Sequence, residues 1–160
     1  YEIRLSLVGS EMCIRDSGKT DVTETPSVEW KRINIGGSYN LGFMTLMAQY
    51  NNGKASGGAA AGQETTSYLI GGAVPFGAST LKFSYVKSEG DGPTAASSQR
   101  DAAQFAVGYQ YDLSKRTALY GTFARIANDG TATYAIGGGS GSPAAGKNST
   151  AYEFGVRHSF

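Results

Sequence analysis

The sequence has little of the chemistry that enzymes and metal-binding proteins use. Its 160 residues include one cysteine and one histidine, which excludes an internal disulfide framework, a multi-Cys zinc site and most triad chemistry. Only 17% of the residues are charged, the formal net charge is +1, and no Lys/Arg tract indicates nucleic-acid binding. No apolar run approaches the ~20 residues that a spanning helix needs. We therefore expect no catalytic residue, no metal and no cofactor.

The composition instead favours a Gly- and Tyr-rich β protein, with 23 Gly, 10 Tyr and 7 Phe. The end of the chain shows the pattern most clearly, because successive side chains of a strand point to opposite faces. One face of the last nine residues carries Tyr152, Phe154, Val156, His158 and Phe160, and the other carries Glu153, Gly155, Arg157 and Ser159. A strand that is aromatic on one side and charged on the other is typical of a membrane β-barrel with a polar interior.

The same period of two continues back to residue 32 and predicts seven strands. They lie at about 31–41, just after Gly42, and at about 65–76, 79–88, 101–113, 116–126 and 150–160. In the strand at about 79–88, for example, Leu81, Phe83 and Tyr85 alternate with Lys82 and Ser84. We therefore predict an all-β antiparallel sheet with one apolar, aromatic face and one polar face.

The strand at about 116–126 leaves two orientations open. Leu119 and Phe123 favour one facing, whereas Tyr120 and Ile126 favour the opposite one. The period of two does not decide between them.

Short and long connections alternate along the chain. The connections at 41–43, 76–79 and 113–116 are tight, whereas those at 51–64, 89–100 and 127–149 are long and rich in Gly, Ala, Ser and Thr. Outer-membrane barrels have short periplasmic turns and long outer loops. The pattern therefore predicts a transmembrane β-barrel in the bacterial outer membrane, with its C-terminus on the periplasmic side. The alternatives are a half-buried soluble sheet and a soluble ligand-binding barrel.

Aromatic residues stand near both ends of the predicted strands. In the third strand, Tyr68 and Phe76 are eight residues apart, which is ~26 Å along a strand and ~20 Å of membrane depth at the usual tilt. Tyr and Phe at both ends of an apolar band suit the two membrane interfaces. The predicted interfacial aromatics are Tyr39, Tyr50, Tyr68, Phe76, Tyr85, Tyr109 and Tyr111.

Residues 1–19 differ from the rest of the chain. Residues 5–17 look like translated sequencing-adapter text, carry the only cysteine, Cys13, and show no sustained period. The run from Cys13 to Thr20 nearly spells a phosphate-binding loop, but it lacks the first glycine and a preceding buried strand. We predict that residues 1–19 are non-native or disordered, and that residues 20–160 are part of one barrel domain. A real but irregular N-terminal segment is the alternative.

Two segments resemble the general Gram-negative porins, especially those of β-proteobacteria. They are Tyr109-Gln110-Tyr111-Asp112-Leu113-Ser114-Lys115-Arg116-Thr117-Ala118-Leu119-Tyr120 and Phe154-Gly155-Val156-Arg157-His158-Ser159-Phe160. The resemblance extends over about residues 25–160. It implies a trimeric, 16-stranded, water-filled barrel that passes small hydrophilic solutes, of which this chain supplies the last seven strands. The family's inward-folded constriction loop lies outside this sequence.

The charges on the predicted polar face are the candidate pore-lining residues. They are Arg32, Lys82, Glu153 and Arg157. Three basic groups against one acidic group predict an anion-leaning wall, since lumen charge contributes to selectivity. The alternative is that these side chains are solvated or paired without affecting permeation, and an ion pair between Glu153 and Arg157 is the clearest case.

The terminal strand has a second role that the resemblance implies. A C-terminal aromatic residue with apolar residues at alternating positions is similar to the signal that the barrel-assembly machinery reads. Tyr152, Phe154, Val156 and Phe160 would carry this signal. His158 fits an interfacial side chain better than a ligand or a base.

The leading function is passive diffusion of small hydrophilic solutes and ions through an outer-membrane porin, with outer-membrane lipid around it. The alternative is a non-conducting structural or adhesive barrel whose outer loops, such as 127–149, bind a host or phage partner. An outer-membrane enzyme needs a Ser/His or Asp/His constellation, which the only histidine, next to the terminus, cannot supply.

Overall fold

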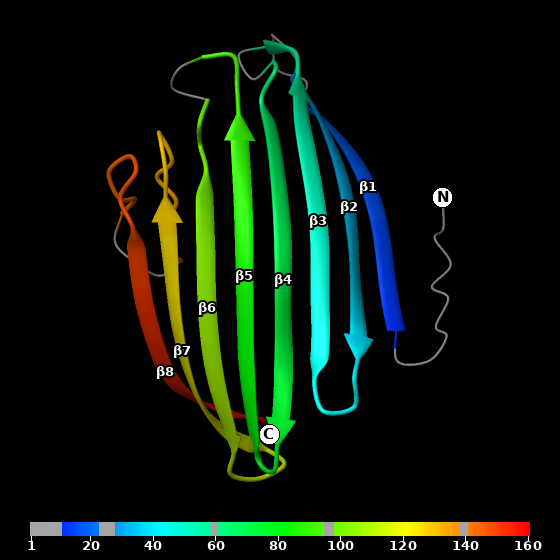
Figure 1. Ribbon diagram of the computed structural model, residues 1–160, viewed down its shortest axis with the longest axis vertical. Helices are drawn as coiled ribbons and strands as arrows, with labels where there is room; N and C mark the ends of the chain where they lie inside the picture. Colours follow the sequence, from blue (N-terminus) through cyan, green and yellow to red (C-terminus); the bar gives the residue numbers. More distant parts are fainter. Residues whose placement is uncertain (1–10, 23–27, 59–60, 95–97, 138–140) are drawn as a thin grey trace.

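The computed structural model describes residues 11–22, 28–58, 61–94, 98–137 and 141–160, which form one antiparallel sheet (Figure 1). The eight strands are β1 (Glu11–Val22), β2 (Val28–Asn40), β3 (Thr45–Ser56), β4 (Glu64–Phe76), β5 (Ser79–Asp91), β6 (Ala102–Asp112), β7 (Thr117–Asn128) and β8 (Ser149–His158). Each strand pairs with the next strand of the sequence, so the spatial order is the chain order. In the described residues, no helix is long and apolar enough to cross a membrane. The predicted all-β antiparallel fold is confirmed.

Short turns and long loops lie at opposite ends of the sheet (Figure 1). The turns after β2, β4 and β6 are short, whereas the connections after β3, β5 and β7 are long, as the sequence predicts. Gly42 and Gly77 take φ values of +87° and +60° in two of the turns, where a side chain would be strained. The third turn is closed by the Ser114 hydroxyl, which accepts hydrogen bonds from the backbone N–H groups of Arg116 and Thr117.

The long connections are shorter than the sequence predicts. The loop expected at 51–64 shrinks to residues 57–63, because β3 continues to Ser56 and pairs with both neighbours. Backbone hydrogen bonds do not depend on apolar side chains, so a strand can continue where its side chains turn polar. The alternation of apolar residues therefore ends before the strand does.

The two faces of the sheet differ in chemistry. Residues directly opposite each other in an antiparallel pair share a face, so the register extends the facing of one strand across the sheet. Most exposed large hydrophobic residues lie on one face, which we call the aromatic face; examples are Ile35, Tyr68, Tyr85, Phe105 and Phe123. We call the other side the polar face.

The facing of β7, left open by the sequence, follows from its register. Leu119 lies opposite Val156, and Phe123 lies opposite Tyr152, so both belong to the aromatic face. Tyr120 lies opposite Gly155 and belongs to the polar face, together with Ile126.

The number of strands needs a correction. The sequence predicts seven strands and sets residues 1–19 aside, yet β1 covers Glu11–Val22 and pairs with β2 along its whole length. Pairing through the backbone can add a strand to an open sheet edge whatever its side-chain pattern, so the missing period was not decisive. That residues 1–19 are non-native stays a prediction.

The sheet has no packed core of the kind a soluble sandwich needs. No large side chain of the described residues is fully buried, and the buried hydrophobic residues are few and mostly small: Ala55, Ala118, Ala124, Ile126 and Ala132. Soluble sheets are stable when one face packs against another layer. The soluble alternatives therefore find no support in the fold.

Candidate functional site

A shallow concavity in the polar face brings two of the predicted charges together. It has a volume of about 400 Å³ and lies across β5 to β8. Among its lining residues are Lys82, Gln110, Tyr120, Thr122 and Arg157. Four neighbouring strands thus each contribute at least one polar side chain, because the register aligns their polar positions.

Lys82 is bound by one neutral side chain, the amide of Gln110. Its Nζ donates a hydrogen bond to Gln110 Oε1 at 3.2 Å, and Gln110 Nε2 donates to Asp112 Oδ1 at 2.8 Å. In the described part of the chain, no carboxylate lies within ion-pair distance of Lys82 or Arg157. Both cations are exposed, so they can interact with an anion from solution.

Glu153 is bound by a tyrosine and not by the nearby arginine. The Tyr120 hydroxyl donates a hydrogen bond to Glu153 Oε1 at 2.8 Å. The Tyr120 ring lies over Gly155, since a Cβ built on Gly155 would stand 2.5 Å from the Tyr120 Oη. The ion pair between Glu153 and Arg157, kept as an alternative from the sequence, is absent from the described residues.

Arg32 shares the polar face with the other three charges but stands apart from them. It lies on β2 opposite Gly53, whereas the concavity begins at β5. The structure therefore brings Lys82 and Arg157 together in the concavity, and places Glu153 and Arg32 on the same face outside its lining.

The predicted interfacial aromatics all lie on the aromatic face, at two levels. Near the loop end of β4, Tyr68 packs against Tyr50 with ring centroids 5.3 Å apart. At its turn end, Phe76 packs against Tyr109 at 6.3 Å. Tyr39, Tyr85 and Tyr111 are also exposed on this face. The spacing of Tyr68 and Phe76 along one strand therefore corresponds to two separate aromatic clusters.

The terminal strand presents its alternating residues outward. Tyr152 and Phe154 are the most exposed aromatics of β8, at 78% and 79%, because β8 is the last strand of the sheet. Val156 and Phe160 continue the same side. His158 Nδ1 shares a 2.8 Å hydrogen bond with the Thr117 hydroxyl, and its ring contacts Phe160 edge-on at 4.9 Å. A side chain so engaged acts as a structural contact at the end of the strand.

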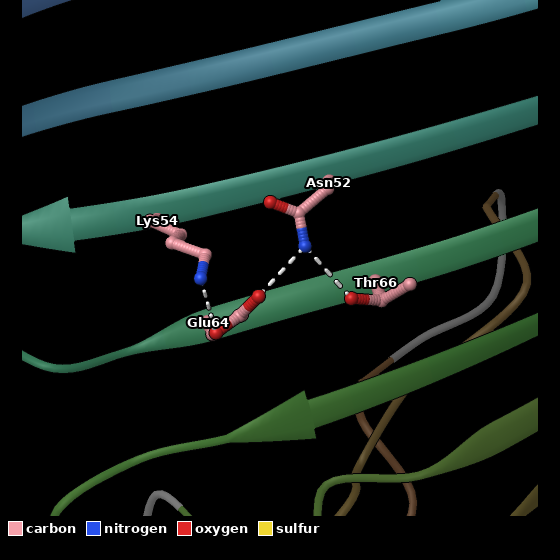
Figure 2. A network of polar contacts seen from close by, with 4 residues as sticks. All are labelled: Asn52, Lys54, Glu64 and Thr66. Atoms are coloured by element: carbon pink, nitrogen blue, oxygen red, sulfur yellow. Dashed lines mark hydrogen bonds and ion pairs between the residues drawn. The ribbon is translucent and has the colours of Figure 1, made fainter.

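A polar cluster lies beyond the Tyr50–Tyr68 pair, toward the long loops (Figure 2). Lys54 Nζ lies 3.0 Å from Glu64 Oε2, and Asn52 Nδ2 donates to Glu64 Oε1 at 2.8 Å and to the Thr66 hydroxyl at 2.9 Å. The register puts these four side chains on the aromatic face, past its apolar band. The position suits the polar boundary of a membrane.

Three residues that form side-chain hydrogen bonds in or next to the concavity were not predicted as site residues. They are Gln110, Tyr120 and Asp112, which bind Lys82, Glu153 and Gln110. These residues alternate in the sequence with Tyr109, Tyr111 and Leu119, so the sequence could have predicted that they lie on the polar face. Their hydrogen-bond partners could not be predicted, because these depend on how neighbouring strands are aligned. The described residues hold no group of three or more His, Cys, Asp or Glu side chains that could bind a metal ion.

Comparison with known proteins gives consistent matches. A family model for Gram-negative porins matches residues 16–131. The outer membrane porin protein 32 of Delftia acidovorans is 33% identical over 132 residues, which is 80% of this chain and 36% of that protein. Because the chain spans about a third of this relative, most of the relative has no counterpart here.

Solved structures contain a sheet that superposes on the one described here. The anion-selective porin from Comamonas acidovorans superposes with a TM-score of 0.82 at 26% identity, covering 96% of this chain and 46% of that one. The trimer form of OmpT of Vibrio cholerae superposes with a TM-score of 0.64 at 15% identity, covering 96% and 53%. The latter likeness concerns the fold alone.

Proposed function

Because the chain belongs to the Gram-negative porin family, we propose that it forms part of the wall of a water-filled channel for small hydrophilic solutes and ions. The observation that carries this proposal is the division of one sheet into an aromatic face and a polar, charged face. The outer-membrane location expected from the sequence is confirmed by the family and by the relatives.

The mechanism involves no covalent chemistry. Strand pairing satisfies the backbone groups, which is obligatory in lipid because no water is there to bind them. The aromatic face contacts lipid, and the polar face keeps the lumen wet. Solutes then diffuse according to the width and charge of the pore. The family and fold indicate a channel, and in our proposal the chain has no enzymatic role.

The charges of the polar face give this wall an anion preference. Arg32, Lys82 and Arg157 share this face with two carboxylates, Glu153 and Asp112, and within the described part of the chain Lys82 and Arg157 face the same concavity without an ion-pair partner. The structurally similar porin from Comamonas acidovorans is anion-selective, which supports the same sign.

The remaining strands and partners complete the proposal. The two outer strands of this sheet, β1 and β8, have one neighbour each, so a closed barrel needs further strands, and the resemblance to general porins implies 16 in all. Three copies assemble as a homotrimer, as the trimer form of one structural neighbour suggests. Tyr152, Phe154 and Val156 on β8, and Phe160 just after it, are exposed for recognition by the barrel-assembly machinery.

Planar-bilayer recording of a full-length porin containing this sheet tests the proposal. We expect stepwise openings and an anion-sided reversal potential in a salt gradient. Lys82→Gln and Arg157→Gln should each lower the anion-to-cation permeability ratio, by roughly twofold for one lumen cation in moderate salt. Lys54→Gln removes one cation from the aromatic face and should leave the ratio unchanged. A folded, inserted protein that stays silent would favour the structural or adhesive barrel.

A further inference from the structure

We propose that Tyr120 is a specificity-determining residue, because its ring keeps Glu153 from neutralising Arg157. The inference rests on the proposed channel function and deepens it. It concerns three positions of β8 that share the polar face, Glu153, Gly155 and Arg157, and the one residue of β7 that lies opposite the middle position.

Without Tyr120, the two charges of β8 should pair. Glu153 and Arg157 are four residues apart on the same face, which is about 13 Å along a strand. Both side chains are long, and between them stands Gly155, which has no side chain to obstruct an approach. When both side chains extend toward each other along the strand, these opposite charges can form an ion pair, although an exposed pair is worth little in stability.

Tyr120 occupies the space where the pair would form. A Cβ built on Gly155 would lie 2.5 Å from Tyr120 Oη, 2.6 Å from Cζ and 2.8 Å from Cε1, so the ring takes the position of the missing side chain. The hydroxyl then holds Glu153 by a hydrogen bond of 2.8 Å. The aromatic ring thus separates the carboxylate from the guanidinium, and the glycine makes the ring's position possible.

The consequence is an uncompensated cation in the concavity. Arg157 lines the concavity together with Lys82 and has no carboxylate partner among the described residues. A passing anion therefore meets two exposed positive groups on one wall. If Glu153 and Arg157 were paired on β8, the anion would instead meet a dipole with no net charge at the position of Arg157. Tyr120 acts through Glu153 and Arg157, and is a positioning residue for selectivity.

Variants of the full-length porin test this role. Tyr120→Ala should lower the anion-to-cation permeability ratio toward that of Arg157→Gln, because Glu153 can then reach Arg157. The double variant Tyr120→Ala/Glu153→Gln should have the same ratio as its reference Glu153→Gln, since without the carboxylate the ring has nothing to separate from Arg157. Tyr111→Ala, which removes a ring from the aromatic face of the neighbouring strand, is the matched control and should leave the ratio unchanged.

The outcomes separate this inference from the proposed function. If Arg157→Gln lowers the ratio but Tyr120→Ala does not, or if Tyr120→Ala lowers the ratio as much in the Glu153→Gln background as in the wild type, the role of Tyr120 is wrong and the channel proposal stands. If Arg157→Gln itself has no effect, the proposed role of the wall charges fails first. Heat-resistant migration on gels checks folding, and Tyr120→Thr, which favours strands, replaces the alanine variant if that does not fold.

Discussion

Three glycines of the sheet lie directly opposite aromatic residues, and each ring lies over its glycine. The pairs are Gly72–Phe83, Gly121–Phe154 and Gly155–Tyr120. Glycine weakens a strand because it has no side chain to pack, and an aromatic partner across the strand compensates for this. Two of these pairs lie on the aromatic face and the third lies on the polar face. The same local device therefore serves packing on one side and charge separation on the other.

Replacement of Gly72 by alanine tests this device. A Cβ at Gly72 would lie 2.6 Å from Phe83 Cζ and 3.2 Å from the backbone oxygen of Thr45, so both the ring and the strand must shift. We expect a loss of about 1–3 kcal/mol in stability, as for other overpacked positions, seen as a lower melting temperature of the detergent-folded porin. Gly137→Ala meets no atom within 4 Å and should change little. Equal melting temperatures for the two variants would contradict the interpretation.

At this scale the sequence predicts the facing of residues better than their contacts. Alternation alone places Lys82 and Arg157 on one face and Tyr68 and Phe76 on the other, and the register agrees. It could not place Tyr120 beside Glu153, because that contact requires β7 and β8 to be aligned residue by residue. That the charges line a pore stays a prediction.

Among the elements, the described parts of the loop between β7 and β8 are fixed to the end of β7 by one side chain. Asn128, at the end of β7 and 7% exposed, donates from Nδ2 to the backbone oxygens of Tyr134 and Lys147 and accepts from the Tyr134 N–H. The loop between β5 and β6 also contacts this loop, because the backbone N–H of Thr131 donates a hydrogen bond to the backbone oxygen of Gln99. One buried amide thus binds both limbs of the last loop.

Loss of this amide should loosen the loop selectively. Asn128→Ala leaves three backbone groups without their partner, and a buried unsatisfied group costs roughly 1–3 kcal/mol. We expect faster proteolysis and faster hydrogen exchange at 129–137 and 141–147, with the strands unchanged. Asn34→Ala breaks one solvent-accessible bond to Gln49 and serves as the control. Unchanged exchange in the loop of the Asn128 variant would show that other contacts hold it.

The turns and strands could be predicted from the sequence where their side chains determine the local structure. The turns follow from glycines that favour positive φ and from the Leu113–Thr117 segment, whose Ser114 closes its own turn. The extension of β3 to Ser56 and the presence of β1 were not predictable, because backbone pairing there does not require apolar side chains. Element type therefore followed from the sequence, but element length did not.

The molecule as a whole is a curved, single-layered sheet with two outer strands (Figure 1). Within the described residues, β1 and β8 do not pair with each other, so each leaves one row of backbone groups without a strand partner. In lipid this is unfavourable by several kcal/mol for each group. The sheet therefore requires the other strands of a barrel, which agrees with the 36% and 46% of the relatives that it covers. Alternation predicted the barrel, and only family resemblance supplied its size.

Access of a water-soluble thiol reagent to two single cysteines tests most directly whether the polar face lines the channel. Thr122 lies in the concavity and Val107 lies on the aromatic face. The variants Thr122→Cys and Val107→Cys change the size of each side chain little. In a cysteine-free full-length porin, a bulky, membrane-impermeant reagent should reduce the single-channel current of Thr122→Cys in discrete steps. It should leave the current of Val107→Cys unchanged, because lipid covers that face. Block through Val107→Cys with no block through Thr122→Cys would contradict the assignment of the two faces.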